Sequence, residues 1–296
     1  MQSQAPEYGG STELPPSSSP QTLAALGGEP ASSASVAPPP TAPPVVVPRL
    51  PGTPDLTSDG LYVFTGGGLE LVVDPHTSTV ARLSLDGKNA LVAPEPRATS
   101  ASAELEGSTL VLKGSADGVT KRFRLDTARR SVEVTYTLVN ATTSTLRAGT
   151  LDFHRVPSAG GLTFFPGTPK LLPGSTLKLN VWQPVIWFAH DQPRDTATVE
   201  GSVESSEGWV ASVNDGLVVV KVVTDTPKPI ISVASAYDAR TKLRPWVEIG
   251  ERTQFELGPG ATATSTVRLF LRKLPPTIAA KSGNQELVGF VRGIIQ

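Results

Sequence analysis

The sequence contains no cysteine. A chain without thiols forms no disulfide framework, has no thiolate nucleophile and cannot hold zinc through sulfur. Histidine is scarce too, because His76, His154 and His190 are the only three and each lies in a different segment. His76 belongs to the turn sequence Asp74-Pro75-His76-Thr77, which favours a structural role. We therefore predict no metal site and no cofactor.

Several catalytic and nucleotide-binding signatures are also missing. No two histidines stand four residues apart, and there is no strained serine turn of the hydrolase type. The glycine triplet Gly66-Gly67-Gly68 lies between two strand-like runs and lacks the helix and the Lys-Ser/Thr pair of a phosphate loop. We interpret it as a flexible hairpin loop.

Charge and hydropathy exclude two kinds of partner. The 26 basic and 27 acidic residues leave no overall field that would attract nucleic acid. No apolar run approaches the roughly 20 residues of a membrane span, since even 216–223 has the length of one strand. We expect a water-soluble domain without a transmembrane segment.

The first 54 residues differ in composition from the rest of the chain. They hold 13 of the 28 prolines, among Ser, Ala, Thr and Gly, and carry very few charges. Such a segment buries too little surface to offset its conformational entropy. We predict a disordered, extended tether over residues 1–54.

Tethers of this composition often join an anchor to a domain of the bacterial envelope. Met1 is followed by Gln2 and Ser3 without the basic and apolar regions of an export signal, so we expect that a signal or lipoprotein anchor has been removed. The predicted location is the periplasm or cell envelope. A cytoplasmic protein with a disordered N-terminus is the alternative.

From residue 61 onward the dominant period is two, interrupted by turn dipeptides. Three hairpins are predicted: 79–85 with the turn Asp86-Gly87, 103–112 with the turn Glu106-Gly107, and 210–223 with the turn Asn214-Asp215-Gly216. The clearest strands are 131–140 and 266–272, each with one apolar face, and 217–223, apolar on both faces and therefore central.

These patterns predict an all-β fold, a large antiparallel β-sandwich over residues 55–275, with no helix before Pro276. Residues 276–296 form a C-terminal tail, with 286–295 either a short helix or a frayed end.

One predicted strand, 243–249, gathers groups that suit a sugar ligand. By the period-two rule Arg244, Trp246 and Glu248 share one face. An indole can stack on the C–H face of a sugar ring while charged groups bond its hydroxyls. An exposed sheet face with a cross-strand ion pair is the alternative.

Two further segments carry candidate binding residues. The predicted strand 150–154 places Asp152 and His154 on one face, where they could hydrogen-bond or flank a ligand. The segment 180–191 is rich in aromatic residues and contains Trp187 and His190. Trp187 is a candidate platform for a ligand, with packing in the core as the alternative.

The stretch from about residue 61 to 274 resembles the galactose mutarotase-like β-supersandwich in pattern and order. The resemblance rests on the opening 68–74, the hairpin 85–91, the strand 136–140 followed by a strand ending at His154, and the closing 245–250 and 257–260. It implies the supersandwich architecture, and it points to an uncharacterised bacterial branch of that superfamily.

In aldose 1-epimerases the matching segments carry an active-site histidine and a glutamate base. The resemblance therefore assigns these positions to His154 and Glu248, and leaves His190 as the acid that protonates the ring oxygen. Two hypotheses follow. One is an exported carbohydrate-binding domain, with or without epimerase-type chemistry, that uses these residues together with Arg244, Trp246, Asp152 and Trp187. The other is a non-catalytic structural or protein-interaction module of the envelope; the sequence leaves the oligomeric state open.

Overall fold

The computed structural model describes residues 51–91, 101–114, 118–148, 152–157, 161–171, 180–182, 185–190, 198–225, 230–236, 246–252 and 255–296, and for part of these strands the backbone alone. All of them belong to one compact unit, Pro48–Gln296. Residues 1–50 of the predicted tether lie outside the described residues, whereas 51–54 are described, with Gly52 and Pro54 buried.

A small antiparallel sheet opens the domain, with its five strands in sequence order. Its strands are β1 (Asp55–Leu56), β2 (Tyr62–Gly66), β3 (Leu69–Asp74), β4 (Thr79–Leu85) and β5 (Lys88–Asn89). The turn Asp86-Gly87 joins β4 to β5 with positive φ at both residues, as a type I′ hairpin requires, and confirms that prediction.

A large antiparallel sheet of fourteen strands forms the rest of the sandwich. Its strands are β6 (Ala101–Glu106), β7 (Thr109–Gly114), β8 (Val119–Asp126), β9 (Ser131–Val139), β11 (Asp152–Pro157), β12 (Leu162–Leu171), β13 (Asn180–Trp182), β14 (Val185–Ala189), β15 (Thr198–Ser205), β16 (Trp209–Asn214), β17 (Leu217–Val223), β18 (Ile230–Ala236), β19 (Trp246–Arg252) and β21 (Thr262–Lys273). A separate pair, β10 (Leu146–Ala148) and β20 (Phe255–Leu257), lies outside it.

The clearest predicted strands form as expected. In β9 the side chains of Val132, Val134, Tyr136 and Leu138 are buried and their neighbours face outward. β17 is buried on both faces between β16 and β21, which explains why its sequence is apolar at every position except Lys221, itself 3% exposed. Several boundaries shift. β6 and β7 turn at Gly107-Ser108, one residue later than predicted, and β11 starts at Asp152 and continues past His154 to Pro157. The strand predicted to end at residue 249 continues to Arg252 as β19, and the strand predicted at 266–272 already begins at Thr262 as β21.

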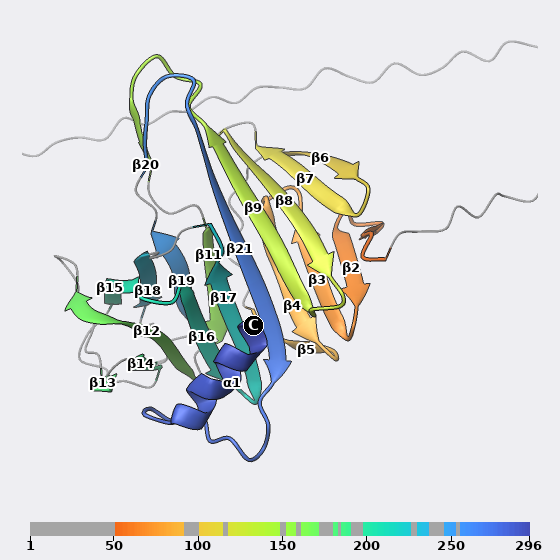
Figure 1. Ribbon diagram of the computed structural model, residues 1–296. Coiled ribbons are helices and arrows are strands. Elements are labelled where there is room, and N and C mark those ends of the chain that lie inside the picture. Colours follow the sequence, from red (N-terminus) through yellow and green to blue (C-terminus); the bar gives the residue numbers. More distant parts are fainter. Residues whose placement is uncertain are drawn as a thin grey trace, which may run out of the picture. The chain divides into compact units, whose positions relative to one another are not determined.

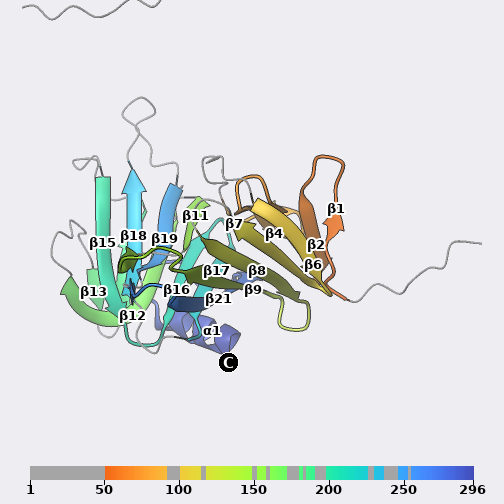
Figure 2. The same ribbon diagram turned by 90° about the horizontal axis from the view of Figure 1, so that it is seen from above.

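The two sheets enclose the main hydrophobic core. Side chains of the small sheet such as Phe64 and Leu71 pack against β7, β8 and β9 and against the inner faces of β17 and β21. A second core lies on the opposite face of the large sheet, under α1 (Gln285–Ile295), the one helix of the described residues. Figures 1 and 2 show α1 and the small sheet on opposite sides of β17 and β21.

Of the two alternatives for the C-terminal segment, the structure has the helix. The side chain of Asn284 caps it by accepting from the Glu286 backbone N–H at 3.1 Å. Its buried residues Leu287, Val288 and Val291 belong to the second core, beside Trp187 and Trp209. This segment is therefore part of the folded domain beyond the predicted end at 275.

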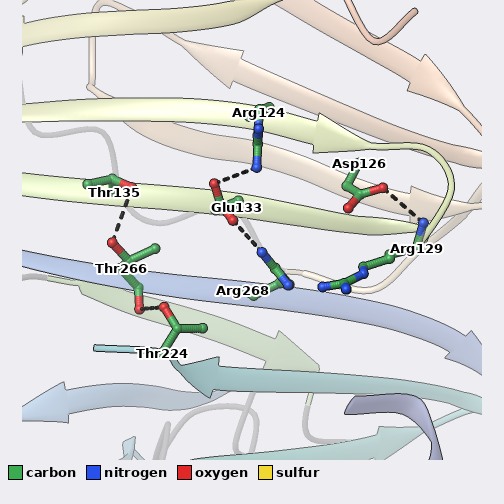
Figure 3. A network of polar contacts seen from close by, with 8 residues as sticks. All are labelled: Arg124, Asp126, Arg129, Glu133, Thr135, Thr224, Thr266 and Arg268. Carbon is green, nitrogen blue, oxygen red and sulfur yellow. Dashed lines mark hydrogen bonds and ion pairs between the residues drawn. The ribbon is translucent and has the colours of Figure 1, made fainter. Parts of the chain in front are cut away.

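The outer face of β8, β9 and β21 is polar (Figure 3). Glu133 on β9 accepts from Arg124 at 2.9 Å and from Arg268 at 2.5 Å, and the hydroxyls of Thr135 and Thr266 lie 3.3 Å apart. These pairs join directly opposed residues, so they stabilise the register of the three strands.

Candidate functional site

A cleft opens between the two sheets, where β5 and the end of β11 approach the β16–β17 hairpin. It has a volume of about 270 Å³, near the lower end of the roughly 300–1,000 Å³ of small-molecule sites. Its walls combine apolar and polar side chains: Lys88, Asn89, Ala90, Val156, Pro157, Ser212, Asn214, Asp215, Leu217 and Val219. A more open hollow of about 530 Å³ shares Asn89 and Pro157 with it.

An ion pair between the sheets closes one side of this cleft. Lys88 Nζ on β5 lies 2.5 Å from Asp215 Oδ2 in the β16–β17 turn and also donates to the Asp215 carbonyl. Both side chains are largely exposed, so the pair contributes little to stability. Its effect is to fix charged groups at the mouth of the cleft.

Asn214 fastens a third element to the same place. Its side-chain Nδ2 donates to the carbonyl oxygen of Pro157 at 3.0 Å, which joins the end of β11 to the end of β16. Asn214 therefore keeps the ends of β11 and β16 close together, and the same side chain lines the cleft.

Behind the cleft lies a buried chain of hydrogen bonds. Ser212 lines the cleft, its hydroxyl lies 2.6 Å from the Thr163 hydroxyl, and Thr163 Oγ1 lies 2.8 Å from His190 Nε2. All three residues are at most 2% exposed. Buried polar groups are usually retained only when they are hydrogen-bonded, and this chain connects His190 to the cleft through two hydroxyls.

Gly161 makes room for the imidazole of His190. The His190 backbone N–H donates to the Gly161 carbonyl at 2.9 Å, and a Cβ at Gly161 would lie 2.2 Å from His190 Nδ1 and 3.0 Å from Asn214 Nδ2. Only glycine therefore fits at position 161 with the ring and the amide in these positions.

The structure places the other predicted site residues in different parts of the fold. Trp187 is fully buried and stacks on Phe164 with ring centroids 4.7 Å apart, so it packs in the second core, the alternative expected for it. Asp152, His154, Trp246 and Glu248 lie on the paired strands β11 and β19. Arg244 lies outside the described residues.

The register of β11 and β19 relates these positions. Glu248 is opposite Arg155, His154 is opposite Ile249, and Trp246 is opposite Pro157, which lines the cleft. Since successive residues alternate faces, positions 154 and 152 share one face and position 248 belongs to the other. The roles assigned to these residues remain predictions, because the structure describes only their backbone.

Several residues that line the cleft are not predicted as site residues by the sequence pattern. Asn89, Asn214 and Asp215 were interpreted only as hairpin and turn residues, although Asn and Asp side chains at turns also present polar groups. A better signal is available for Thr163 and Ser212. Each interrupts an apolar strand at an inward-facing position, where a polar side chain needs a partner.

The histidines support no metal site in the described residues. There, no three His, Asp or Glu side chains gather as metal ligands. His76 is held in its turn by a bond from its backbone N–H to Asp74 Oδ1 at 2.8 Å, in agreement with its predicted structural role.

Together, the two sheets and the cleft define a large antiparallel β-sandwich with a small-molecule-sized cleft between its layers. Its sequence matches no family model and no curated protein. Solved structures do match. A candidate aldose 1-epimerase from Escherichia coli K12 aligns with a TM-score of 0.53 and 12% identity, over 72% of this chain and 99% of that one.

Two galactose mutarotase-like proteins give similar values. The one from Lactobacillus casei aligns with a TM-score of 0.52 and 9% identity over 72% of this chain and 100% of that one. The one from Clostridium acetobutylicum has a TM-score of 0.51 and 9% identity, over 75% and 98%. The chain has the galactose mutarotase-like fold, as its sequence pattern predicted.

Proposed function

We propose that this domain binds a carbohydrate in the cleft between its two sheets. The observation that carries the proposal is the lining of the cleft, in which Asn89, Asn214, Ser212 and the Lys88–Asp215 pair surround an apolar floor of Val156, Leu217 and Val219. Amide, hydroxyl and charged groups bond sugar hydroxyls, and an apolar floor suits the C–H face of the ring. The fold, shared with a candidate aldose 1-epimerase and a galactose mutarotase-like protein, supports the same ligand class.

A glycan array followed by calorimetric titration of each hit tests this proposal. Ser212→Ala removes a hydroxyl from the cleft wall and should weaken binding at least fivefold. Ser205→Ala is the matched control, because Ser205 is also buried and hydrogen-bonded but lies on β15, outside the cleft lining. Absence of binding to every mono- and oligosaccharide would instead favour the structural or protein-interaction module.

Epimerase-type chemistry is a second candidate, favoured by the buried chain from His190 to the cleft. With His190 protonated, its Nε2 proton could move to Thr163 while the Thr163 proton moves to Ser212 and the Ser212 proton to the ring oxygen of a bound sugar. The resemblance adds Glu248 as the base. Polarimetry of a freshly dissolved aldose should then show mutarotation faster than in buffer, and Glu248→Gln should remove most of the acceleration.

The polarimetry also separates binding from catalysis. If a sugar binds while mutarotation stays at the buffer rate, the domain is a binding module without epimerase activity. Thr163→Val, which breaks the chain but preserves side-chain shape, should lower the rate more than the affinity if the chain carries protons.

We also propose that the domain is exported and held in the envelope by its N-terminal tether. The proline-rich, nearly uncharged composition of residues 1–54 supports this location. Within the described residues, no helix has the length and apolar character of a membrane span. Fractionation of the native bacterium with an antibody to the domain tests the location, and recovery with a cytosolic marker would contradict it.

A further inference from the structure

A group of basic residues lies at one end of the cleft, outside its lining. It consists of Arg129 and Arg130 in the β8–β9 turn and Arg272 and Lys273 at the end of β21; we call it the basic rim. Arg129, Arg130 and Lys273 are exposed, and Arg272 is half-buried. The rim is assembled from segments about 140 residues apart in the sequence.

Backbone contacts fix the centre of the rim. Arg272 Nη1 donates to the Arg130 carbonyl at 2.8 Å, and Arg272 Nη2 donates to the Arg129 carbonyl at 2.5 Å. The Arg272 guanidinium thus holds the turn from which Arg129 and Arg130 project. Capping this turn accounts for Arg272, but it gives no role to the side chains of Arg129 and Arg130.

These three arginines form no ion pair with a carboxylate in the part of the chain that the structure describes. The arginines of the neighbouring outer face differ in this respect, because the side chains of Arg124 and Arg268 both pair with Glu133. Arg129 contacts Asp126 only through its backbone N–H (Figure 3). Burial and then the nearby charge of Arg130 lower the pKa of Arg272. Like charges therefore lie together here, offset in part by Asp126 and by Asp86, whose pKa is lowered first by Lys273 and then by the charge of Arg130.

The glycine triplet of the β2–β3 loop allows this assembly. A Cβ at Gly66 would lie 2.3 Å from Thr127 Cγ2, one at Gly67 would lie 3.2 Å from Arg130 Cγ, and one at Gly68 would lie 2.5 Å from Asp86 Oδ1. The β8–β9 turn and Asp86 thus close against the loop from two sides. A side chain at Gly67 would push Arg130 away from the rim, and side chains at Gly66 and Gly68 would displace Thr127 and Asp86.

The rim is continuous with the mouth of the cleft. Lys273 pairs with Asp86 at 2.7 Å, and Leu217, the register partner of Lys273, lines the cleft, as do Lys88 and Asp215. Counting Lys88 with the four rim residues gives five positive charges against three from Asp86, Asp126 and Asp215, a local charge of +2 in a chain whose formal net charge is −1. Such a concentration of charge attracts anions.

We propose that the carbohydrate bound by this domain is anionic and that Arg129 and Arg130 bind its acidic groups, either uronate carboxylates or phosphate or sulfate esters, where the chain of sugars leaves the cleft. Arginine suits this role because its planar guanidinium bonds such oxyanions with two parallel N–H groups. This inference rests on the proposed function, since it names the ligand class of the same cleft.

Tetragalacturonate and its fully methyl-esterified form are matched probes, because they share one sugar chain and differ only in whether each carboxyl group is ionised or carries a methyl ester. We expect calorimetry at 50 mM NaCl to give at least tenfold tighter binding for the acid than for the ester. Raising the NaCl to 500 mM should weaken binding of the acid and leave the ester unchanged, because salt screens the attraction. A neutral oligosaccharide carrying one 6-phosphate or 6-sulfate distinguishes ester anions from carboxylates.

The variant Arg129→Gln/Arg130→Gln should remove the preference for the acid while the ester still binds. The control Arg122→Gln/Arg124→Gln carries the same change in charge on the outer face of β8 and should retain the preference. All four arginines have substantial exposure, so both variants should fold, as circular dichroism would verify.

The outcomes separate the two proposals. Equal affinity for acid and ester would overturn the anionic ligand while sugar binding stands. Undiminished preference in Arg129→Gln/Arg130→Gln would overturn the assignment to the rim. Failure of every sugar, charged or neutral, would overturn the proposed function itself.

Discussion

Replacing Gly161 by alanine should destabilise the domain by about 2 to 4 kcal/mol. The added methyl carbon would lie 2.2 Å from His190 Nδ1 and 2.7 Å from His190 Cε1, well inside van der Waals contact. The ring is 2% exposed and its Nε2 is bonded to Thr163, so it cannot move without breaking that bond. Overpacking costs about 1–3 kcal/mol. Breaking the bond between His190 and Thr163 costs about 0.5–1.5 kcal/mol more, because the Thr163 hydroxyl keeps Ser212 as a partner.

Urea denaturation measures this loss directly, and thermal unfolding should show a fall in Tm of roughly 10 °C for a domain of this size. Gly258→Ala is the control, because no atom lies within 4 Å of its added carbon, and its effect should stay within about 0.5 kcal/mol. In the double variant Gly161→Ala/His190→Ala the clash is gone, so the loss should be at least about 1 kcal/mol smaller than the sum of the single losses. The reasoning is refuted if Gly161→Ala behaves like Gly258→Ala or if the two substitutions are additive.

Three other predictions concern the helix, an acidic residue and the N-terminus. Leu287→Ala, at a fully buried position of α1, should cost about 2–5 kcal/mol in urea denaturation, whereas Gly289→Ala, with open space around its Cβ, should stabilise by up to about 1 kcal/mol; equal effects would contradict the packing of α1. The hydrogen bond from Arg292, and after it the one from Trp209, lowers the pKa of Glu207 below 4.5. The ionised Glu207 therefore stabilises the fold above pH 4.5, and this stabilisation is lost as the pH falls through the lowered pKa. Glu207→Gln should reduce the fall in stability at acidic pH, and an unchanged fall would refute this. Limited proteolysis should remove the tether, so that the new N-terminus lies between about residues 48 and 57, and should leave Tm unchanged, because the composition of the tether predicts no packing contacts. Protection of residues 10–45 from the protease would refute that prediction.

Local sequence was sufficient for most of the strands. Hairpins such as 79–85 with Asp86-Gly87 were predictable because two-residue turns with positive φ demand Asp, Asn or Gly at fixed positions. β21 was predicted from its apolar face, but the burial of Phe270 on its opposite face was not, because that burial comes from α1 and the second core. The alternation of apolar and polar residues in one strand does not show whether an element from elsewhere in the chain covers its second face.

The cleft was harder to predict than the fold. Its groups come from β5, β11 and the β16–β17 hairpin, and pairs such as Lys88 and Asp215 are 127 residues apart. Strand alternation orders residues within one strand, and it cannot say which strands face each other across a sandwich. Thr163 and Ser212, which connect His190 to the cleft, could not be identified from the sequence for this reason, although His190 itself was a candidate.

The position of β21 has a consequence for how the polypeptide reaches its native state. Among the strands that the structure describes, only β21 joins the group β6–β9 to the group that begins with β17. It reaches β9 across 135 residues, through Arg268 and Glu133. Until residues 262–273 are available, β9 and β17 present two open edges with apolar faces, the kind of surface that pairs with other chains. The large sheet therefore cannot form completely until β21 has paired with both β9 and β17. We expect this pairing to be a slow, late step of folding, and we expect aggregation when residues 262–273 are missing or pair late.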